Sequence, residues 1–484
     1  MNVVIPTIKW SAIGPELILS VTAMVLLLLS VLVKRESRKI IPPLSLAGVL
    51  LALGFSVSLW GQAEYAFQGM IVLDNYSLFF KIVFLVTTAL TILMSIRYLQ
   101  QEGFEHSEYY ILILFAAVGM MLMASAADLI IVFLGLETFS LAIYVLAGFF
   151  RTQAKSNESA LKYFLLGSFS TGFLVYGIAL IYGATGTTNL KGIFEFLRRT
   201  SLLQDPLLLF AMGLLIVGFG FKVASVPFHM WTPDVYEGAP TSITAFMSVG
   251  PKAAGFAAFL RVFLYSLSSL QAEWIWVLWV LAVLTMTLGN IVAIAQKNIK
   301  RMLAYSSIAH AGYILVAMVA ANELGTASIL YYLLAYAFMN LGAFGVVILY
   351  GRRGEENLLI TDYSGLGSKY PLLAALMAIF MFSLAGIPPT AGFVGKFYIF
   401  SAAVKAGYLG LAVIGVLNSA LSVYFYLRIT VMMYMRNAEK ELPPIAWSPA
   451  MAISLFVAVF GTLQMGITPA AYLEVARKSI LALM

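Results

Sequence analysis

The sequence predicts an all-α protein that crosses a membrane about 14 times and contains two inverted five-helix repeats with broken helices 7 and 12. Three observations support this prediction. Of the 484 residues, 62% are hydrophobic and only 11% are charged, whereas an ordinary soluble domain has about 25% charged residues. Apolar runs of about 20 residues, the length that spans a bilayer, recur along the whole chain. Similar segments return at an interval of five runs, which indicates an internal duplication.

The composition excludes several classes of protein. Roughly 300 apolar residues exceed what the core of a soluble enzyme requires. The chain has no cysteine, which excludes thiolate-held zinc, iron–sulfur clusters and disulfides. Three histidines are too few for a multi-haem core. No G-x-x-x-x-G-K-[ST] phosphate loop occurs, so the chain has no nucleotide-driven energy source of its own.

Apolar runs bounded by charged or Gly-, Pro- and Asn-rich stretches are the predicted spans. In chain order they cover residues 15–33, 41–60, 77–98, 108–126, 128–149, 157–183, 206–226, 241–265, 273–295, 302–321, 326–350, 371–405 with a break, 409–435 and 447–468. No connection is long enough for a separate domain. The longest, residues 184–205, combines Phe and Leu with Lys and Arg, so we expect a short helix at the membrane surface there.

The distribution of Lys and Arg predicts the orientation of the chain. Connections after odd-numbered spans hold 15 basic residues: Lys34, Arg35, Arg38, Lys39, Arg97, Arg151, Lys155, Lys297, Lys300, Arg301, Arg352, Arg353, Lys369, Arg436 and Lys440. The opposite side holds 7: Lys9, Lys191, Arg198, Arg199, Lys405, Arg477 and Lys478. Basic residues concentrate on the inner, cytoplasmic side of a membrane, so we expect both termini outside.

The predicted duplication relates spans 4–8 to spans 9–13. Span 6 begins YFLLGS at Tyr163, and span 11 begins YYLLAY at Tyr331, 168 positions later. AIYVL of span 5 matches AGYIL of span 10, and FGFKVASVP of span 7 matches FMFSLAGIP of span 12. Five spans, an odd number, separate the copies, so the copies are inverted relative to each other, which is a transporter architecture. The predicted divisions are the N-terminal helices, the two repeats, and the last helix with its tail: residues 1–107, 108–265, 273–435 and 436–484.

Prolines lie at matching places in spans 7 and 12. Proline removes a backbone donor and clashes with the preceding turn. Pro227 therefore predicts a helix break in span 7, and Gly386, Pro388 and Pro389 predict one in span 12. Non-helical backbone at that depth persists only beside protein or a water-filled cavity. A simple proline kink is the alternative, and it is weaker in span 12, where Gly386 adds to the break.

Four charged side chains lie deep in the predicted spans. They are Glu137 in span 5, Lys222 in span 7, Lys252 in span 8 and Lys396 in span 12. A charge that faces lipid at that depth is costly, so we expect each to face protein or water and to serve transport. The alternative for each is a structural ion pair or another buried structural charge.

Other basic residues lie nearer the ends of the spans. We expect Lys81, Arg261 and Arg428 to extend their ammonium or guanidinium groups toward the lipid headgroups. Lys162 is intermediate, five or six residues inside span 6. Both interpretations stay open for Lys162: a member of a proton relay, or a side chain that reaches the headgroups.

Polar residues share helix faces in four spans. Thr244, Ser248 and Lys252 recur every four residues in span 8 and so lie on one face. His310 alone fits either a packed histidine or a relay member. One such face typically joins helices, but four of them near buried lysines predict a hydrated path. The other three faces hold Ser306, His310 and Tyr313 in span 10, Tyr332, Tyr336 and Asn340 in span 11, and Asn418, Ser422 and Tyr426 in span 13.

The deep residues suit proton transfer better than metal binding. A hard cation requires several oxygen ligands, whereas the deep set is three lysines, one glutamate and one histidine. All of these groups exchange protons, and burial favours the neutral form of a lysine. A nearby carboxylate opposes that effect, so movement of Glu137 relative to Lys222 would switch proton binding.

Four segments carry a family resemblance: GLETFSLAIYVL around Glu137, FKVASVPFHMWTPDVYEGAPT from Phe221, KRMLAYSSIAHAGY from Lys300, and LAGIPPTAGFVGK ending at Lys396. Over essentially its whole length, the chain resembles the antiporter-like membrane subunits of respiratory complex I, the NADH-quinone oxidoreductase. The WTPDVYEGAPT form resembles the N-type subunits rather than the L and M types.

The resemblance implies proton translocation without a redox centre in this chain. The implied relay contains Glu137, Lys222, Lys252 and Lys396, with His310 between two half-channels. The residues themselves add further candidates: Lys162, Ser248, Ser306, Tyr313 and Asn340. The resemblance also implies that FMN, iron–sulfur clusters and quinone reside in partner subunits, where quinone reduction drives the cycle. The implied surroundings are other membrane-arm subunits, especially the M-type and K-type neighbours, and the lipid bilayer, with no nucleic acid.

Two other functions fit parts of the sequence. A subunit of a cation/proton antiporter or of a membrane-bound hydrogenase would share the Glu and Lys pattern, so the WTPDVYEGAPT segment is the main discriminator. A stand-alone solute transporter that works by rocking would need a substrate pocket, whereas the deep groups here are proton carriers.

Overall fold

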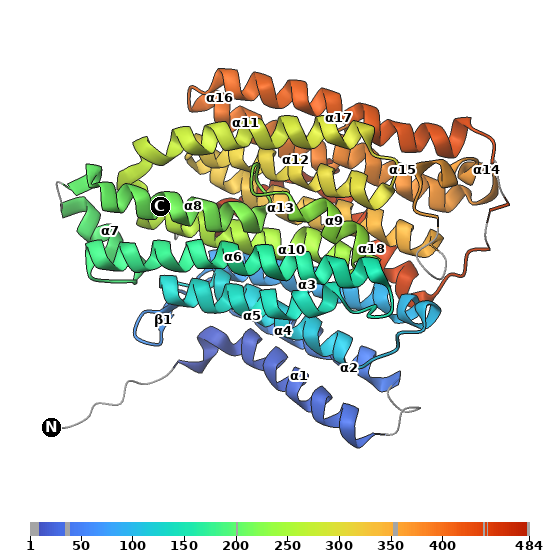
Figure 1. The fold of residues 1–484 in the computed structure, drawn as a ribbon, viewed down its shortest axis with the longest axis horizontal. Helices are drawn as coiled ribbons and strands as arrows, with labels where there is room; N and C mark the ends of the chain where they lie inside the picture. The colour runs from blue at the N-terminus through green and yellow to red at the C-terminus, as the bar shows by residue number, and fades with distance from the viewer. Residues whose placement is uncertain are drawn as a thin grey trace.

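Long helices run side by side through the molecule, as the apolar runs predict (Figure 1). The computed structural model describes residues 9–33, 39–199, 202–351, 357–438, 441–442 and 444–481, and 19 α-helices lie in these ranges. Twelve helical segments of the described chain are long and apolar enough to span a membrane, and two shorter helices are also apolar. This range of 12 to 14 agrees with the predicted number of spans.

The helices of the first half begin and end close to the predicted positions, and a surface helix follows the sixth. They are α1 (Gly14–Leu32), α2 (Ile41–Ser58), α3 (Asn75–Glu102), α4 (Glu108–Ala124), α5 (Leu129–Ala147), α6 (Ala154–Thr185), α7 (Leu190–Arg199), α8 (Pro206–Val223), α9 (Trp231–Gly238) and α10 (Thr241–Leu260). A π-helical turn, η4 (Arg261–Ser266), extends α10. Helix α7 confirms the helix expected within 184–205, and it buries Leu190, Ile193 and Leu197 on one face.

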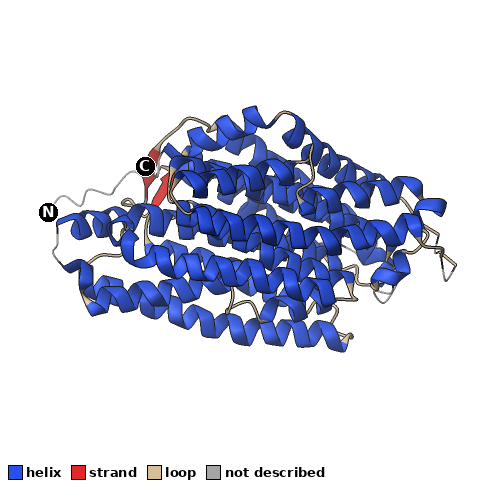
Figure 2. Ribbon diagram, turned by 90° about the horizontal axis from the view of Figure 1, so that it is seen from above, coloured by secondary structure: helices blue, strands red, loops and turns tan. Residues whose placement is uncertain are grey.

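The second half adds nine helices. They are α11 (Gln271–Ala295), α12 (Ile299–Ala320), α13 (Glu323–Tyr350), α14 (Leu366–Lys369), α15 (Pro371–Ala385), α16 (Ala391–Lys405), α17 (Leu409–Met435), α18 (Pro449–Ile467) and α19 (Pro469–Ile480). The sequence analysis gave no range for α9, α14 or α19, nor did it predict the hairpin of β1 (Glu64–Ala66) and β2 (Ile71–Leu73). The two strands lie at one end of the bundle (Figure 2).

Local sequence signals explain many of the helix ends. The side chain of Asp74 accepts a hydrogen bond from the backbone of Ser77 at 2.7 Å and so caps α3. Asp128 and Asp205 cap α5 and α8 in the same way. At the other end of α3, Gly103 has a φ of 79°, a left-handed conformation that glycine adopts without strain.

Three helices form the centre of the bundle. The most apolar stretch is fully buried in α10 with η4, 94% buried in α12 and 83% buried in α13, compared with 33% in the peripheral helices α1, α2 and α6. Polar side chains on the central helices therefore face other helices, whereas the exposed apolar side chains of α1, α2 and α6 can face lipid or a partner. Lys252, His310 and Asn340 all lie on the central helices.

The expectation that three basic residues reach toward the headgroups is wrong. The side chain of Lys81 is fully buried, and its Nζ lies 2.8 Å from Glu16. Arg261 is also buried and donates two hydrogen bonds, of 2.9 and 3.1 Å, to Asp74. Arg428 donates to the backbone carbonyls of Ile294 and Gln296. Acceptors from helices and loops distant in the sequence satisfy each charge, which periodicity does not reveal.

The count of Lys and Arg residues that predicts the orientation includes residues that the structure does not describe. Six of its residues lie outside the described part of the chain: Lys34, Arg35, Arg38, Arg352, Arg353 and Lys440.

We predict that Lys81→Met destabilises the protein by about 3–5 kcal/mol, because it leaves the buried carboxylate of Glu16 without its partner. Thermal unfolding of the intact complex, monitored by the release of this chain, measures the loss of stability. The double variant Lys81→Met/Glu16→Met removes both charges and should recover most of the stability. Lys9→Gln is the matched control, since the Lys9–Glu64 pair is solvent-exposed. Equal stability of Lys81→Met and wild type would contradict the assignment.

Candidate functional site

The first helix break lies at Pro227, as predicted. Helix α8 ends at Val223, and Ala224 has a left-handed φ of 60°. The N–H of Ser225 donates to the carbonyl of Gly220 at 2.8 Å, which closes the helix end. The chain then passes through a cis peptide at Pro227 and resumes as α9. His229, which the sequence analysis did not single out, lies in this break. Its Nδ1 is buried and has no hydrogen-bond partner in the described part of the chain.

The second break lies between α15 and α16, also as predicted. Gly386 ends α15 with a φ of 86°, and the N–H of Ile387 donates to the carbonyl of Phe382 at 2.9 Å. The Pro388–Pro389 peptide is cis. A Cβ on Gly386 would lie 3.0 Å from Cδ of Lys396. Glycine is therefore required here both for its conformation and for the close approach of Lys396.

Lys222 and Glu137 face the same region from α8 and α5. Lys222 is buried, and its Nζ donates a hydrogen bond of 2.9 Å to Ser140. Ser140 follows Glu137 by three residues and so lies beside it on α5. Glu137 is half-buried and accepts a 2.8 Å hydrogen bond from Thr171. No ion pair joins Glu137 to Lys222 directly, and Lys222 instead bonds Ser140, one turn from Glu137 on α5.

Lys252 lies on α10 and contacts α12. Its Nζ donates to the carbonyl of Ser307 at 2.9 Å and also bonds the Ser307 hydroxyl. Helix α10 packs against the end of α8, where a Cβ on Gly255 would lie 3.4 Å from Cβ of Lys222. One turn before Lys252, Ser248 accepts a hydrogen bond from Asn340 on α13. The sequence analysis named Ser306 rather than Ser307, because Ser306 shares a face with His310.

His310 is buried among tyrosines from three helices. Its Nδ1 bonds the hydroxyl of Tyr332 at 2.5 Å, and its Nε2 bonds the hydroxyl of Tyr426 at 3.0 Å. Tyr426 also bonds Ser306. Both ring nitrogens thus have partners that can donate or accept a proton. This arrangement favours the relay interpretation, because each tyrosine can pass a proton to or from the ring.

Lys396 lies against the end of α15. Its Nζ donates to the carbonyls of Leu384 and Ala385 at 2.9 and 3.0 Å, and to Ser419 at 3.0 Å. The free carbonyls of a helix C-terminus carry partial negative charge, which stabilises a cation. The ammonium also lies 4.8 Å from the ring centre of Tyr313. The helix break thus supplies two of the three oxygens that accept from Lys396.

The contacts arrange these groups in neighbouring clusters rather than in one unbroken chain of hydrogen bonds among the described residues. Ser306 and Ser307 are adjacent, which brings the His310 cluster beside the Lys252 cluster. The rings of His310 and Tyr313 are 5.7 Å apart, and Tyr313 lies under Lys396. Tyr313 also accepts a hydrogen bond from Asn290. The gaps between clusters require water or side-chain movement for a proton to pass.

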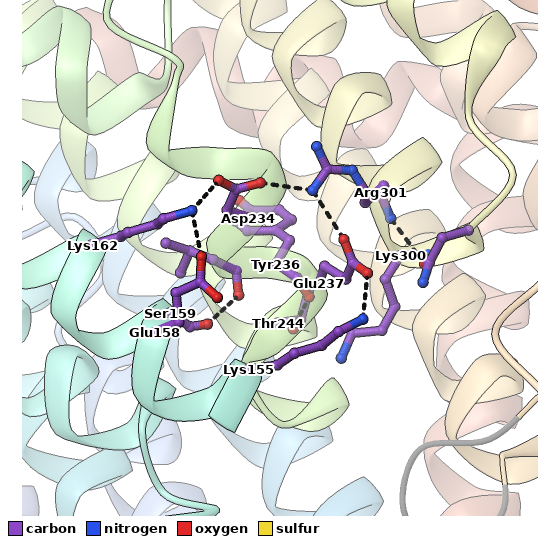
Figure 3. A network of polar contacts seen from close by, with 12 residues as sticks. Lys155, Glu158, Ser159, Lys162, Asp234, Tyr236, Glu237, Thr244, Lys300 and Arg301 are labelled. Atoms are coloured by element: carbon purple, nitrogen blue, oxygen red, sulfur yellow. Dashed lines mark hydrogen bonds and ion pairs between the residues drawn. The ribbon is translucent and has the colours of Figure 1, made fainter. Parts of the chain in front are cut away.

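Lys162 lies in an ion-pair network at one end of the bundle (Figure 3). Its Nζ is 2.7 Å from both Glu158 and Asp234. Arg301 on α12 bonds Asp234 at 2.7 Å and Glu237 at 2.9 Å, and Lys155 completes the network. Burial by itself raises the pKa of Asp234, but the hydrogen bonds from Lys162 and Arg301 outweigh it and lower that pKa below its ordinary value.

The network fixes α9 between α6 and α12. The network is partly exposed, since 39% of the Lys162 side chain is accessible. Sequence reasoning missed the three acidic residues of this network, although Asp234 and Glu237 belong to the WTPDVYEG segment. Among the described residues, no group of three or more His, Asp and Glu side chains could hold a metal ion.

Comparisons with known proteins agree with this geometry. The family model described as NADH:quinone oxidoreductase/Mrp antiporter, TM, matches residues 126–422. The chain is 54% identical over 474 residues to NADH-quinone oxidoreductase subunit N of Trichlorobacter lovleyi, covering 98% of this chain and 97% of that protein. It is 48% identical over 473 residues to subunit N 2 of Rhizobium meliloti, covering 98% of each.

Solved structures agree as well. A chain of respiratory complex I from Thermus thermophilus superposes with a TM-score of 0.81 at 36% identity, covering 95% of this chain and 98% of that one. A chain of the Mrp complex from Dietzia superposes with a TM-score of 0.85 at 21% identity, covering 98% of each, which shows a shared fold. The chain therefore belongs to the subunit N family of NADH-quinone oxidoreductases, among the antiporter-like membrane subunits of respiratory complex I.

Proposed function

We propose that this chain carries protons across the membrane through Glu137, Lys222, Lys252, His310 and Lys396, as part of a bacterial NADH-quinone oxidoreductase. The carrying observation is the surroundings of Lys222, Lys252 and Lys396. Oxygens of hydroxyls and carbonyls hold Lys222, Lys252 and Lys396, and no carboxylate in the described part of the chain pairs with any of them. A lysine paired with a carboxylate stays charged, whereas one among neutral oxygens is stable with or without its proton.

Glu137 supplies the switch in this proposal. Its carboxylate bonds Thr171 while Lys222 bonds Ser140, one turn away on the same helix, so a movement of α5 relative to α8 would make or break an ion pair. When the ion pair forms, Lys222 retains its proton, and when it breaks, the proton can pass toward Lys252. The remaining route to Lys396 passes Ser248 and Asn340, then Ser306 and His310, and finally Tyr313. Lys162 does not belong to this route, because its ion pairs serve the attachment of α9.

The energy comes from partner subunits in this proposal. FMN, iron–sulfur clusters and quinone belong to those partners, among which we expect the M-type and K-type neighbours in the membrane arm. Quinone reduction there would drive the movement of α5 relative to α8 that changes the distance between Glu137 and Lys222. Moving one charge against 100 mV costs about 2.3 kcal/mol, which this chain cannot supply by itself.

We also propose that residues 108–265 and 273–435 are inverted repeats, flanked by the N-terminal helices 1–107 and the segment 436–484. The two breaks support this proposal, because each closes its first half-helix with the same pair of hydrogen bonds. Ser225 and Ile387 bond back five residues, and Ala224 and Gly386 bond back three. Ala224 matches Gly386 at an offset of 162, one more than the offset of Pro227 to Pro388.

The likeness to the Mrp chain suggests an alternative function, that of a cation/proton antiporter subunit. A subunit of a membrane-bound hydrogenase is a second alternative. The likeness to the Mrp chain is at 21% identity, and so it supports the fold alone. The relatives at 54% and 48% identity are both N subunits of NADH-quinone oxidoreductases. This difference in identity favours the first proposal.

We predict that Lys222→Met abolishes proton translocation through this chain while the complex still assembles and oxidises NADH. The methionine fills the space of the lysine but cannot hold a proton. The ratio of protons translocated to NADH oxidised in membrane vesicles should fall. Lys405→Met is the matched control, because Lys405 is an exposed lysine on α16, the helix that carries Lys396. An unchanged ratio in Lys222→Met would refute the role of Lys222.

We predict that Gly386→Ala lowers proton translocation more than it lowers assembly. The alanine adds about 1–2 kcal/mol of backbone strain, and its Cβ displaces Lys396 from the carbonyls of α15. The same vesicle assay measures the effect. Gly410→Ala is the control, since a Cβ on Gly410 meets no atom within 4 Å. Full translocation by Gly386→Ala would show that the position of Lys396 is unimportant.

The proposed orientation predicts which side of the membrane each connection faces. The chain has no cysteine, so single cysteines report without background from this chain. Lys297→Cys should react with a membrane-impermeant maleimide from the cytoplasmic side, and Lys191→Cys from the periplasmic side. Both lysines are exposed. The reverse pattern of labelling would overturn the orientation with both termini outside.

A further inference from the structure

One face of α13 reaches from one cluster of the proposed proton route to the next. Its polar residues recur every four positions, so successive side chains lie one turn apart, about 6 Å along the helix. At one end of this face, Tyr332 bonds Nδ1 of His310. At the other end, Asn340 donates a hydrogen bond to Ser248, one turn from Lys252 on α10. The face therefore contacts both the His310 cluster and the Lys252 cluster.

Tyr336 is the residue in the middle of this face. The centre of its ring lies 5.0 Å from the centre of the His310 ring. Its hydroxyl lies near the hydroxyl of Ser307, which accepts a hydrogen bond from the ammonium of Lys252. Ser307 and His310 are three positions apart and so lie on one face of α12. Tyr336 therefore faces the single turn of α12 that separates the Lys252 cluster from the His310 cluster.

The hydroxyl of Tyr336 has no fixed partner. Only 3% of Tyr336 is exposed, and its hydroxyl forms no regular hydrogen bond with any described residue. A buried hydroxyl without a partner costs free energy, and a phenylalanine would fill the same space without that cost. Tyr236 also lies beside Lys252, but its hydroxyl donates to the carbonyl of Met247. The hydroxyl of Tyr336, by contrast, can accept a proton on one side and donate its own on the other.

We propose that Tyr336 carries the proton across the gap between Lys252 and His310, a step that rests on the proton route proposed above. The ammonium of Lys252 gives a proton to the hydroxyl of Ser307, which gives its own proton to the hydroxyl of Tyr336. The proton of Tyr336 then passes through one water to Tyr332, and Tyr332 gives its own proton to Nδ1 of His310. Each hydroxyl gains one proton and loses one, so only Lys252 and His310 change charge.

The remaining partners of His310 serve the onward step in this proposal. Tyr426 bonds Nε2, the other ring nitrogen, and it also bonds Ser306. A proton that enters the ring at Nδ1 can therefore leave at Nε2. Tyr336 and Ser307 thus belong to the side of His310 that receives the proton from Lys252, and Ser306 belongs to the opposite side.

The experiment compares Tyr336→Phe with the wild type in the intact complex. The phenylalanine retains the ring that packs against His310 and removes only the hydroxyl. We expect the ratio of protons translocated to NADH oxidised in membrane vesicles to fall to the value of Lys222→Met, which marks the complete loss of transfer through this chain. The thermal stability of the complex should be unchanged or higher, because the variant removes a buried hydroxyl without a partner. A merely structural hydroxyl would lower the stability together with the ratio.

Tyr363→Phe is the matched control. Tyr363 is fully buried, and its hydroxyl also has no hydrogen-bond partner among the described residues. It ends the short helix η6 (Ile360–Tyr363) and packs against Tyr350, which lies 14 positions beyond Tyr336, about 21 Å along α13. The control should leave the ratio of protons to NADH unchanged. Assembly of each variant complex shows that the chain has folded.

Three results would overturn the role of Tyr336. The first is an unchanged ratio in Tyr336→Phe, and the second is a fall of the ratio together with the thermal stability. The third is an equal fall in Tyr363→Phe, which would show a general effect of removing a buried hydroxyl. The Lys222→Met variant separates this proposal from the proton route. An unchanged ratio in Lys222→Met contradicts both proposals, whereas a lowered ratio there with an unchanged ratio in Tyr336→Phe contradicts only the role of Tyr336.

Discussion

The cost of placing a charge away from water determines much of this structure. Two groups of buried charges meet that cost differently. Lys81 and Arg261 have carboxylate partners, Glu16 and Asp74, and so they are fixed in the charged form and join helices. Within the described ranges, Lys222, Lys252 and Lys396 hydrogen-bond only to hydroxyls and carbonyls. The first group stabilises the bundle, and the second leaves room for a change of protonation.

The helix breaks follow from the same cost. A carbonyl inside a helix already accepts one intrahelical hydrogen bond, whereas the last carbonyls of a helix have no intrahelical partner and can accept more readily from a buried ammonium. Ending α15 at Gly386 frees the carbonyls of Leu384 and Ala385, and these accept from Lys396. At the other break, Lys222 lies in the last turn of α8, where the hydroxyl of Ser140 accepts from it. Each break therefore belongs to the environment of a lysine, and the ion-pair network of Figure 3 holds α9, which follows the first break, against α6 and α12.

The sequence determined the all-helical fold, the number of spans to within two, and the positions of Pro227, Gly386 and the four deep charges. These features follow from local rules, because hydrophobic length, proline and depth within a span are read along one segment at a time. The tertiary structure decided which partner each charge has. Lys81 and Lys222 are both buried lysines in apolar spans, yet one meets Glu16 and the other meets Ser140. Those partners lie 65 and 82 positions away in the chain, and only helix packing brings them within a hydrogen bond.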